Sequence, residues 1–262
     1  MSRLSQIALL WVSLGISTAI GPLVQAQTPA PAPAELTNAI AQIQAAANQR
    51  NLSVVMGFYS PDFSSNDGIN NVQLSEALAQ LWQRYPQLFY ETELQSWERA
   101  GDELVAETVT TIRGTQTEAG RTTEIVSTIR SRQYFRNGQV LRQEILSERT
   151  NVTAGENPPQ VRVNLPETAT PGQQFGFDVI VEEPLRNDVL LGAAVEETVK
   201  SDLYLQPSAL ELEPLSAGGI FKLVKAPAQI DSRWLSAIIV RDDGITQVTQ
   251  RLRVVDAPKS AQ

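Results

Sequence analysis

The chain has 262 residues, no cysteine, no histidine and a formal net charge of −8 at pH 7. Without cysteine there are no disulfides and no thiolate chemistry, and without histidine there is no Ser-His-Asp triad and no usual zinc ligand set. The acidic balance, with no run of lysine or arginine, excludes nucleic acid as a partner. We therefore predict no cofactor and no metal site, in a chain long enough for two domains.

Residues 1–26 have the pattern of a signal peptide. Arg3 supplies a positive charge, residues 7–20 form an apolar stretch, and small residues lead to a cleavage position after Ala26. The alternative is an uncleaved anchor, but Gly21-Pro22 breaks the apolar run before it is long enough to span a membrane. We expect export to a periplasm, an equivalent lumen or the medium, with no membrane span after cleavage. The alternating Pro-Ala residues 27–34 then form an extended tether.

Three helices are predicted after the tether. Apolar residues at spacings of four, three and four indicate a helix over 36–47, and a short helix over 52–59 ends before Pro61. A third helix begins after Asn70, which has Gln73 three residues later as a capping box, and ends at Pro86. The segment YSPDFSSNDG, residues 59–68, is predicted to close the second helix and then form a polar loop.

Four long antiparallel strands follow, over 88–97, 103–113, 121–136 and 139–149, because the hydrophobic period changes to two. Asn137-Gly138 is the strongest turn signal, since both central residues of a type I′ turn need a positive φ. Three N-terminal helices packed on a curved antiparallel sheet make an α+β cone over residues 35–150.

This pattern resembles the nuclear transport factor 2-like, or SnoaL-like, family, which includes the ketosteroid isomerases. The resemblance rests on the helix order, the YSPDF segment after the second helix and the terminal hairpins. It implies a cone-shaped domain, and it suggests homodimerisation through the outer face of the sheet. In isomerase-like members the general base is an aspartate eight residues beyond an aromatic that closes the second helix. Asp67 lies eight residues after Tyr59 and so matches that position.

The same chemistry needs oxyanion donors, which are a tyrosine on the first helix and a protonated carboxylic acid on a strand. Aligned without gaps, these two positions fall near Ile43 and Ser131, so both donors are missing. Aspartate before glycine is also a common turn pair. The turn interpretation of Asp67 is therefore favoured. The alternative is an isomerase-like or lyase-like enzyme that uses Asp67 as base and Tyr59 or Tyr90 as a replacement donor.

Strand alternation predicts which residues line the cone. Along each predicted strand, every second residue is apolar or carries a hydroxyl or amide, and the residues between them carry the charges. The concave face should then hold no titratable group except Asp67. Trp97 belongs to the alternating set that carries the charges, so it should lie on the outer face and cover a domain or subunit interface. The predicted ligand-binding residues are Tyr59, Asp67, Tyr90, Thr108, Ser127 and Ser131.

The C-terminal part is predicted to be a second, all-β domain. Residues 151–159 look like a linker, and short alternating segments follow over 160–165, 174–181, 189–196, 201–206, 218–224, 233–241 and 245–255. These indicate an immunoglobulin-like β-sandwich over 160–256, with a tail at 257–262. The leading function is a non-enzymatic binding or interaction protein of the cell envelope. Its cone would hold a small neutral ligand or a protein partner.

Overall fold

The computed structural model describes residues 31–118, 120–184, 189–200, 211–215 and 218–257. The predicted signal peptide, the first half of the tether, the segment 201–206 and most of the tail lie outside these residues. The described residues from Ala32 onward belong to one compact unit.

The described helices are α1 (Ala34–Asn48), α2 (Leu52–Gly57) and α3 (Asn71–Arg84), and all of them precede the long strands. The capping box predicted for the third helix is confirmed, because Asn70 accepts from the backbone of Gln73 and the Gln73 side chain accepts from the backbone of Asn70. Among the described residues, no helix is long and apolar enough to cross a membrane.

The segment between α2 and α3 corrects the sequence prediction. It forms strand β1 (Tyr59–Ser65), which pairs in parallel with β5 (Gln139–Gly155), instead of a helix end followed by a loop. The six-residue α2 is too short to be stable alone, so tertiary pairing decides the conformation beyond Phe58. Pro61 is compatible with a strand at the edge of a sheet, where it need not donate a ladder hydrogen bond.

A meander of long strands forms the sheet beside the helices: β2 (Gln87–Ala100), β3 (Glu103–Glu118), β4 (Arg121–Arg136) and β5. Asn137 and Gly138 both have positive φ, 51° and 76°, as the predicted tight turn requires. At the outer edge of β2, side chains of α1 replace a neighbouring strand. Asn48 donates to Tyr90 O (2.9 Å) and accepts from Tyr90 N (2.7 Å), and Gln44 accepts from Thr92 N (2.7 Å).

Strand β5 continues through residues 151–155, so the linker predicted at 151–159 is wrong over its first half. The second half of β5 pairs with β13 (Gly244–Val254), while its first half pairs with β1. The described strands thus form one ten-stranded sheet, and its main order is β10-β9-β12-β13-β5-β4-β3-β2. Gly155, with φ of 101°, ends β5 where a Cβ atom would lie 2.4 Å from Asp243 O, so glycine is required there.

The C-terminal strands complete this sheet and add a small second one. The long sheet contains β7 (Thr168–Ala169), β9 (Leu191–Thr198), β10 (Glu213–Pro214) and β12 (Asp231–Val240) beside β13. The small sheet has the order β11-β8-β6, with β6 (Val161–Asn164), β8 (Gln174–Val181) and β11 (Gly219–Lys225). Phe177 and Val179 of β8 share a hydrophobic core with Leu235 and Ile239 of β12. Since one sheet of this core is the continuation of the cone sheet, a separate immunoglobulin-like sandwich is not confirmed.

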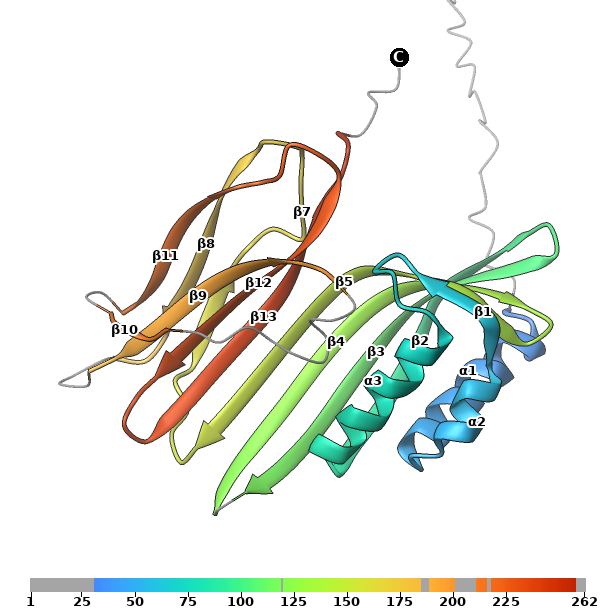
Figure 1. Ribbon diagram of the computed structural model, residues 1–262, viewed down its shortest axis with the longest axis horizontal. Coiled ribbons are helices and arrows are strands. Elements are labelled where there is room, and N and C mark those ends of the chain that lie inside the picture. The colour runs from blue at the N-terminus through green and yellow to red at the C-terminus, as the bar shows by residue number, and fades with distance from the viewer. Residues whose placement is uncertain (1–30, 119, 185–188, 201–210, 216–217, 258–262) are drawn as a thin grey trace, which may run out of the picture. The chain divides into compact units, whose positions relative to one another are not determined.

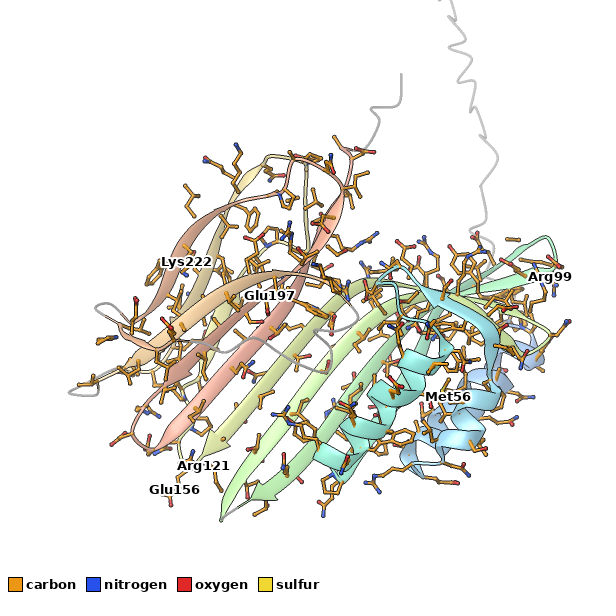
Figure 2. The ribbon with its side chains drawn as sticks, in the orientation of Figure 1. Met56, Arg99, Arg121, Glu156, Glu197 and Lys222 are labelled. Atoms are coloured by element: carbon orange, nitrogen blue, oxygen red, sulfur yellow. The ribbon has the colours of Figure 1, made fainter. Side chains whose placement is uncertain are left out.

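The helices and the small sheet cover opposite faces of the long sheet (Figure 1). Leu235 and Leu252 face the small sheet, whereas their chain neighbours Trp234 and Arg251, which are cross-strand partners, face the other way. Trp234 and Arg251 both donate hydrogen bonds to Glu148, whose cross-strand partner Ile129 lies beneath the helices. Figure 2 shows the side chains on both faces.

A β-bulge corrects the prediction for Trp97. The register of β2 against β3 shifts between Leu94 and Ser96, so that Trp97 faces Ala106. One extra residue reverses the alternation of every later side chain. Trp97 therefore packs against the buried core beneath the helices, which includes Leu104 and Phe135, and does not have the parity of the charged face.

Candidate functional site

A cavity of about 170 Å³ lies between the helices and the concave face of the sheet. Helices α1, α2 and α3 supply apolar side chains such as Ile40, Val55 and Leu74. The strands supply most of the polar side chains, which include Tyr90, Thr92, Thr110, Ser131, Gln133 and Gln143. No charged side chain is among the described residues that line it.

The predicted binding residues separate into two groups. Tyr59, Tyr90 and Ser131 line the cavity. Thr108 and Ser127 do not line it and are buried; their hydroxyls pair with those of Ser131 (3.2 Å) and Thr150 (2.8 Å), respectively. They hold neighbouring strands together, which is a usual role for cross-strand hydroxyl pairs.

Several polar groups of the cavity wall are already satisfied by the protein. The Thr92 and Thr110 hydroxyls lie 3.1 Å apart and hydrogen-bond each other. The Tyr90 hydroxyl accepts from Trp82 Nε1 at 2.8 Å. Burial raises the pKa of Tyr90, although the Trp82 hydrogen bond and the charge of Arg50 oppose the shift. Tyr90 is thus fixed as a neutral, oriented wall residue.

Three other polar groups of the cavity are not satisfied. The Tyr59 hydroxyl and the side-chain amides of Gln133 and Gln143 hydrogen-bond none of the residues that the structure describes. Gln133 and Gln143 are direct cross-strand partners on β4 and β5. Burial raises the pKa of Tyr59 to about 12, so its hydroxyl is a neutral donor near pH 7. The cavity therefore presents one hydroxyl and two amides without protein partners.

Sequence reasoning missed Gln133 as a site residue. Strand alternation puts Gln143 on the concave face of the predicted strand 139–149, and it puts Gln133, two residues beyond Ser131, on the same face of the predicted strand 121–136. The signal was therefore present in the alternation. What the alternation could not show is that the two amides have no partner.

Asp67 lies outside the cavity lining and belongs to a buried ion cluster. Its two carboxylate oxygens each accept a hydrogen bond from Arg251, from Nη1 and Nη2 at 2.8 Å. Arg251 Nη2 also donates to Glu148 Oε2 at 3.0 Å, and Trp234 Nε1 donates to the same oxygen at 3.0 Å. The side chains of Arg251, Asp67 and Glu148 are 0%, 3% and 14% exposed. This bidentate, desolvated geometry is that of a structural ion pair.

The turn interpretation of Asp67 describes the backbone only. Gly68 has φ of 76°, and the backbone N–H of Asp67 donates to Ser65 Oγ at 3.2 Å, as in a polar turn. The carboxylate, however, is held by Arg251. Because that carboxylate neither lines the cavity nor has a free oxygen facing it, the geometry does not support its use as a general base.

Two features hid this ion cluster from sequence reasoning. The register of β4 against β5 shifts between Arg130 and Ser131, where Leu146 is the extra residue, and this puts Glu148 on the concave face. Arg251 lies 184 residues from Asp67 in sequence, in the part that was predicted to be a separate domain. The prediction that Asp67 is the only titratable group on that face is therefore wrong.

The comparisons with known proteins cover different parts of the chain. A family model described as a domain of unknown function (DUF8623) matches residues 156–255. Comparison with curated proteins finds no match. Among solved structures, a nuclear transport factor 2-like protein of unknown function from Burkholderia pseudomallei is 11% identical. The match covers 43% of this chain and 90% of that one, with a TM-score of 0.32.

Two further solved structures are similar at the same level. An LEH-like epoxide hydrolase from Mycobacterium tuberculosis is 10% identical, over 44% of this chain and 84% of that one, with a TM-score of 0.31. Bd1075 from Bdellovibrio bacteriovorus is 16% identical, with a TM-score of 0.31. That match covers 42% of this chain but only 38% of Bd1075. The neighbours thus include nuclear transport factor 2-like proteins, and values this low carry no information on activity.

Proposed function

We propose that the protein is a non-enzymatic binding protein whose cavity, beneath helices α1 to α3, holds a small neutral molecule. The observation that carries the proposal is the set of unpartnered groups on Tyr59, Gln133 and Gln143. Among the described residues, none of these three groups has a fully buried side-chain atom without a partner, so water can reach them in the empty cavity. A ligand that offers both donors and acceptors can replace that water and make the same hydrogen bonds.

The size and charge of the cavity limit the ligand. A volume of about 170 Å³ lies below the ~300–1,000 Å³ of typical ligand sites and near the ~150 Å³ of a cavity that accepts benzene. We therefore expect a ligand of roughly ten non-hydrogen atoms or fewer. Since no charged residue lines the described cavity, an ionic ligand would be left without a counter-charge. A compact amide, lactam or hydroxylated ring fits these limits.

The enzymatic alternative lacks support from the site geometry. It needs Asp67 within hydrogen-bond reach of a substrate proton, but the Asp67 carboxylate is held by Arg251 outside the cavity. Tyr59 and Tyr90 are neutral donors, and without a base they can orient a ligand but cannot remove a proton from it.

A native mass spectrum of the purified protein tests the proposal, compared with a spectrum under denaturing conditions. We expect an added mass of roughly 200 Da or less that is released on denaturation, given the cavity volume. Gln143→Leu should lower the retained fraction several-fold. Gln80→Leu, which alters an exposed glutamine of α3, should leave the fraction unchanged.

An apoprotein spectrum in wild type and both variants would count against a tightly held ligand. It would favour ordered water in the cavity, or binding of a partner on the surface. The partner, the homodimer and the location in the cell envelope stay predictions from the sequence. Export can be tested separately by determining the N-terminal residue of the mature protein, because cleavage after Ala26 would leave Gln27 as the first residue.

A further inference from the structure

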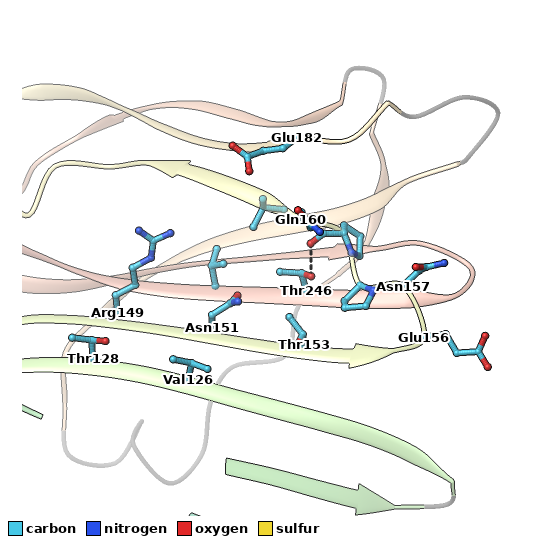
Figure 3. A pocket seen from close by; sticks show the side chains of 14 residues that line it. Val126, Thr128, Arg149, Asn151, Thr153, Glu156, Asn157, Gln160, Glu182 and Thr246 are labelled. Carbon is cyan, nitrogen blue, oxygen red and sulfur yellow. Dashed lines mark hydrogen bonds between the residues drawn. The ribbon is translucent and has the colours of Figure 1, made fainter. Parts of the chain in front are cut away.

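A second hollow lies on the opposite face of the long sheet, away from the helices. It is a groove of about 740 Å³ between the sheet and the segment that leads into β6 (Figure 3). Cross-strand neighbours of β4, β5 and β13 form its floor: Thr128 beside Arg149, Asn151 between Val126 and Val248, and Thr153 beside Thr246. The residues that alternate with these point to the side of the helices: Ile129 of β4 lines the small cavity, and Glu148 of β5 belongs to the ion cluster. The two hollows are therefore separate.

The opposite wall of the groove is fixed by the chain itself. Pro158, Pro159, Gln160 and Val161 form it, and Thr246 Oγ1 donates to Pro159 O at 2.6 Å. The wall is thus anchored to β13 by a buried hydrogen bond. A hollow with a rigid floor and an anchored wall is preformed, which lowers the entropy cost of binding.

Arg149 gives the groove an available positive charge. Its side chain is exposed, and it forms no ion pair or hydrogen bond with the residues that the structure describes. Neither of the two carboxylates that line the groove pairs with Arg149. Glu182 pairs with Arg162 at 3.6 Å, and Glu156 lies at the other end of the groove and points away from it (Figure 3). Arginine binds carboxylates in a planar, bidentate manner.

Asn151 supplies a second polar group whose presence folding does not explain. Its Oδ1 is buried and accepts no hydrogen bond, and its Nδ2 donates none to the described residues. Its cross-strand neighbours on both sides are valines, Val126 and Val248. Valine would suit this strand position better, since it has high β-propensity and no unsatisfied atom.

We propose that this groove binds a short extended peptide that carries a carboxylate. The carboxylate pairs with Arg149, a peptide carbonyl accepts from Asn151 Nδ2, and an aliphatic side chain contacts Val126 and Val161. Arg149 and Asn151 are two residues apart on β5, roughly 6.6 Å, which is also the repeat of an extended peptide. The strip from Arg149 to Thr153 spans roughly 13 Å, enough for about four extended residues.

Other ligand classes fit the groove less well. No aromatic side chain is among the described lining residues, so sugar rings and bases lack a stacking surface. One unpaired arginine is also too little for a phosphate backbone, which needs several cationic contacts. The proposal does not depend on the ligand of the cavity beneath the helices, because the sheet separates the two sites.

The test is a titration of the isotopically labelled full-length chain, followed by NMR chemical shifts, with three acetylated peptides. Ac-Ala-Ala-Val carries a free C-terminal carboxylate, Ac-Ala-Glu-Val-amide carries a side-chain carboxylate, and Ac-Ala-Ala-Val-amide carries none. We expect at least one carboxylate peptide to bind with a Kd of about 1 mM or tighter, and the neutral peptide to bind about tenfold more weakly. Comparison of the first two peptides distinguishes a chain terminus from an acidic side chain.

Matched variants locate the site. Arg149→Gln should lower the affinity of the carboxylate peptide about tenfold, to that of the neutral one. Arg99→Gln removes the same charge from an exposed arginine of β2, which Figure 2 shows far from Glu156, and should change nothing. Asn151→Val should lower the affinity while the melting temperature stays equal or rises, a result that a purely structural asparagine would not give.

Two results would overturn the proposal. One is the absence of shifts in the groove residues with both carboxylate peptides at about 10 mM. The other is an equal loss of binding in Arg149→Gln and Arg99→Gln, which would show attraction by net charge and no site.

Discussion

Two polar clusters lie on the same face of the long sheet, and they differ in how their groups are satisfied. In the charged cluster of Asp67, Glu148 and Arg251, the guanidinium donates hydrogen bonds to both carboxylates. The Trp234 indole N–H donates a further hydrogen bond to Glu148. The neutral cluster is made of Tyr59, Gln133 and Gln143, and its side chains hydrogen-bond none of the described residues.

The difference follows from the cost of burial. An unpaired buried charge costs several kcal/mol, so a fold that buries Asp67 must supply Arg251. A neutral hydroxyl or amide costs much less, so a cavity can keep one unpaired until a ligand or water arrives. The charged cluster therefore joins the turn after β1 and strand β5 to β13 and stabilises the fold, whereas the neutral cluster is free to bind a ligand.

The largest effect is expected for Arg251→Met, which leaves the carboxylates of Asp67 and Glu148 buried together without a counter-charge. We expect the free energy of unfolding to fall by about 3–5 kcal/mol. Asp67→Asn should cost less, because Arg251 keeps its pair with Glu148. Urea unfolding measures both values.

The exposed Arg99→Met is the control for the change of net charge. If Arg251→Met were no more destabilising than Arg99→Met, the charged cluster would have no structural role, and the distinction between the two clusters would fail.

The pH dependence of stability tests the neutral state of Tyr59. Its pKa rises from 10 to about 12 on folding because the hydroxyl is buried. The folded state therefore favours the neutral form, and this contribution is complete below about pH 10 and is lost as the pH rises towards 12. The free energy of unfolding should fall by about 2 kcal/mol between pH 9 and pH 12 from this group alone. Tyr59→Phe should remove that part of the slope, and an unchanged slope would show a solvated hydroxyl.

Asn48 is a third case beside the charged and the neutral clusters, because its neutral amide is paired with the backbone. Asn48 donates to and accepts from the backbone of Tyr90 at the edge of β2, so its amide is fully used by the fold. Asn48→Ala should lower the free energy of unfolding by about 1–2 kcal/mol. Asn38→Ala, at an exposed position of the same helix, should cost nothing. Equal effects of the two variants would mean that α1 does not cap this edge.

Local chemistry made part of the fold predictable from the sequence. The Asn137-Gly138 turn and the Asn70 capping box depend on neighbouring residues only, and both are present. Alternation placed Tyr90 and Ser131 on the cavity wall. These signals need no knowledge of distant partners.

The rest depends on long-range pairing, which alternation does not encode. The extra residues near Gln95 and Leu146 reverse the faces of Trp97 and Glu148. The pairing of β5 with β13 turns the predicted linker into a strand and brings Arg251 to Asp67. The role of Asp67 is therefore set by Arg251, a residue of the other predicted domain.

The most direct measurement is the free energy of unfolding of the Gln133→Leu/Gln143→Leu double variant, compared with wild type after both are refolded without ligand. If the amides serve a ligand, leucine removes two unpaired polar groups and adds apolar burial, so the stability should be equal or higher by about 1 kcal/mol. A loss of about 2 kcal/mol or more would show that the amides hold the fold together, and that this part of the sheet contains no binding site.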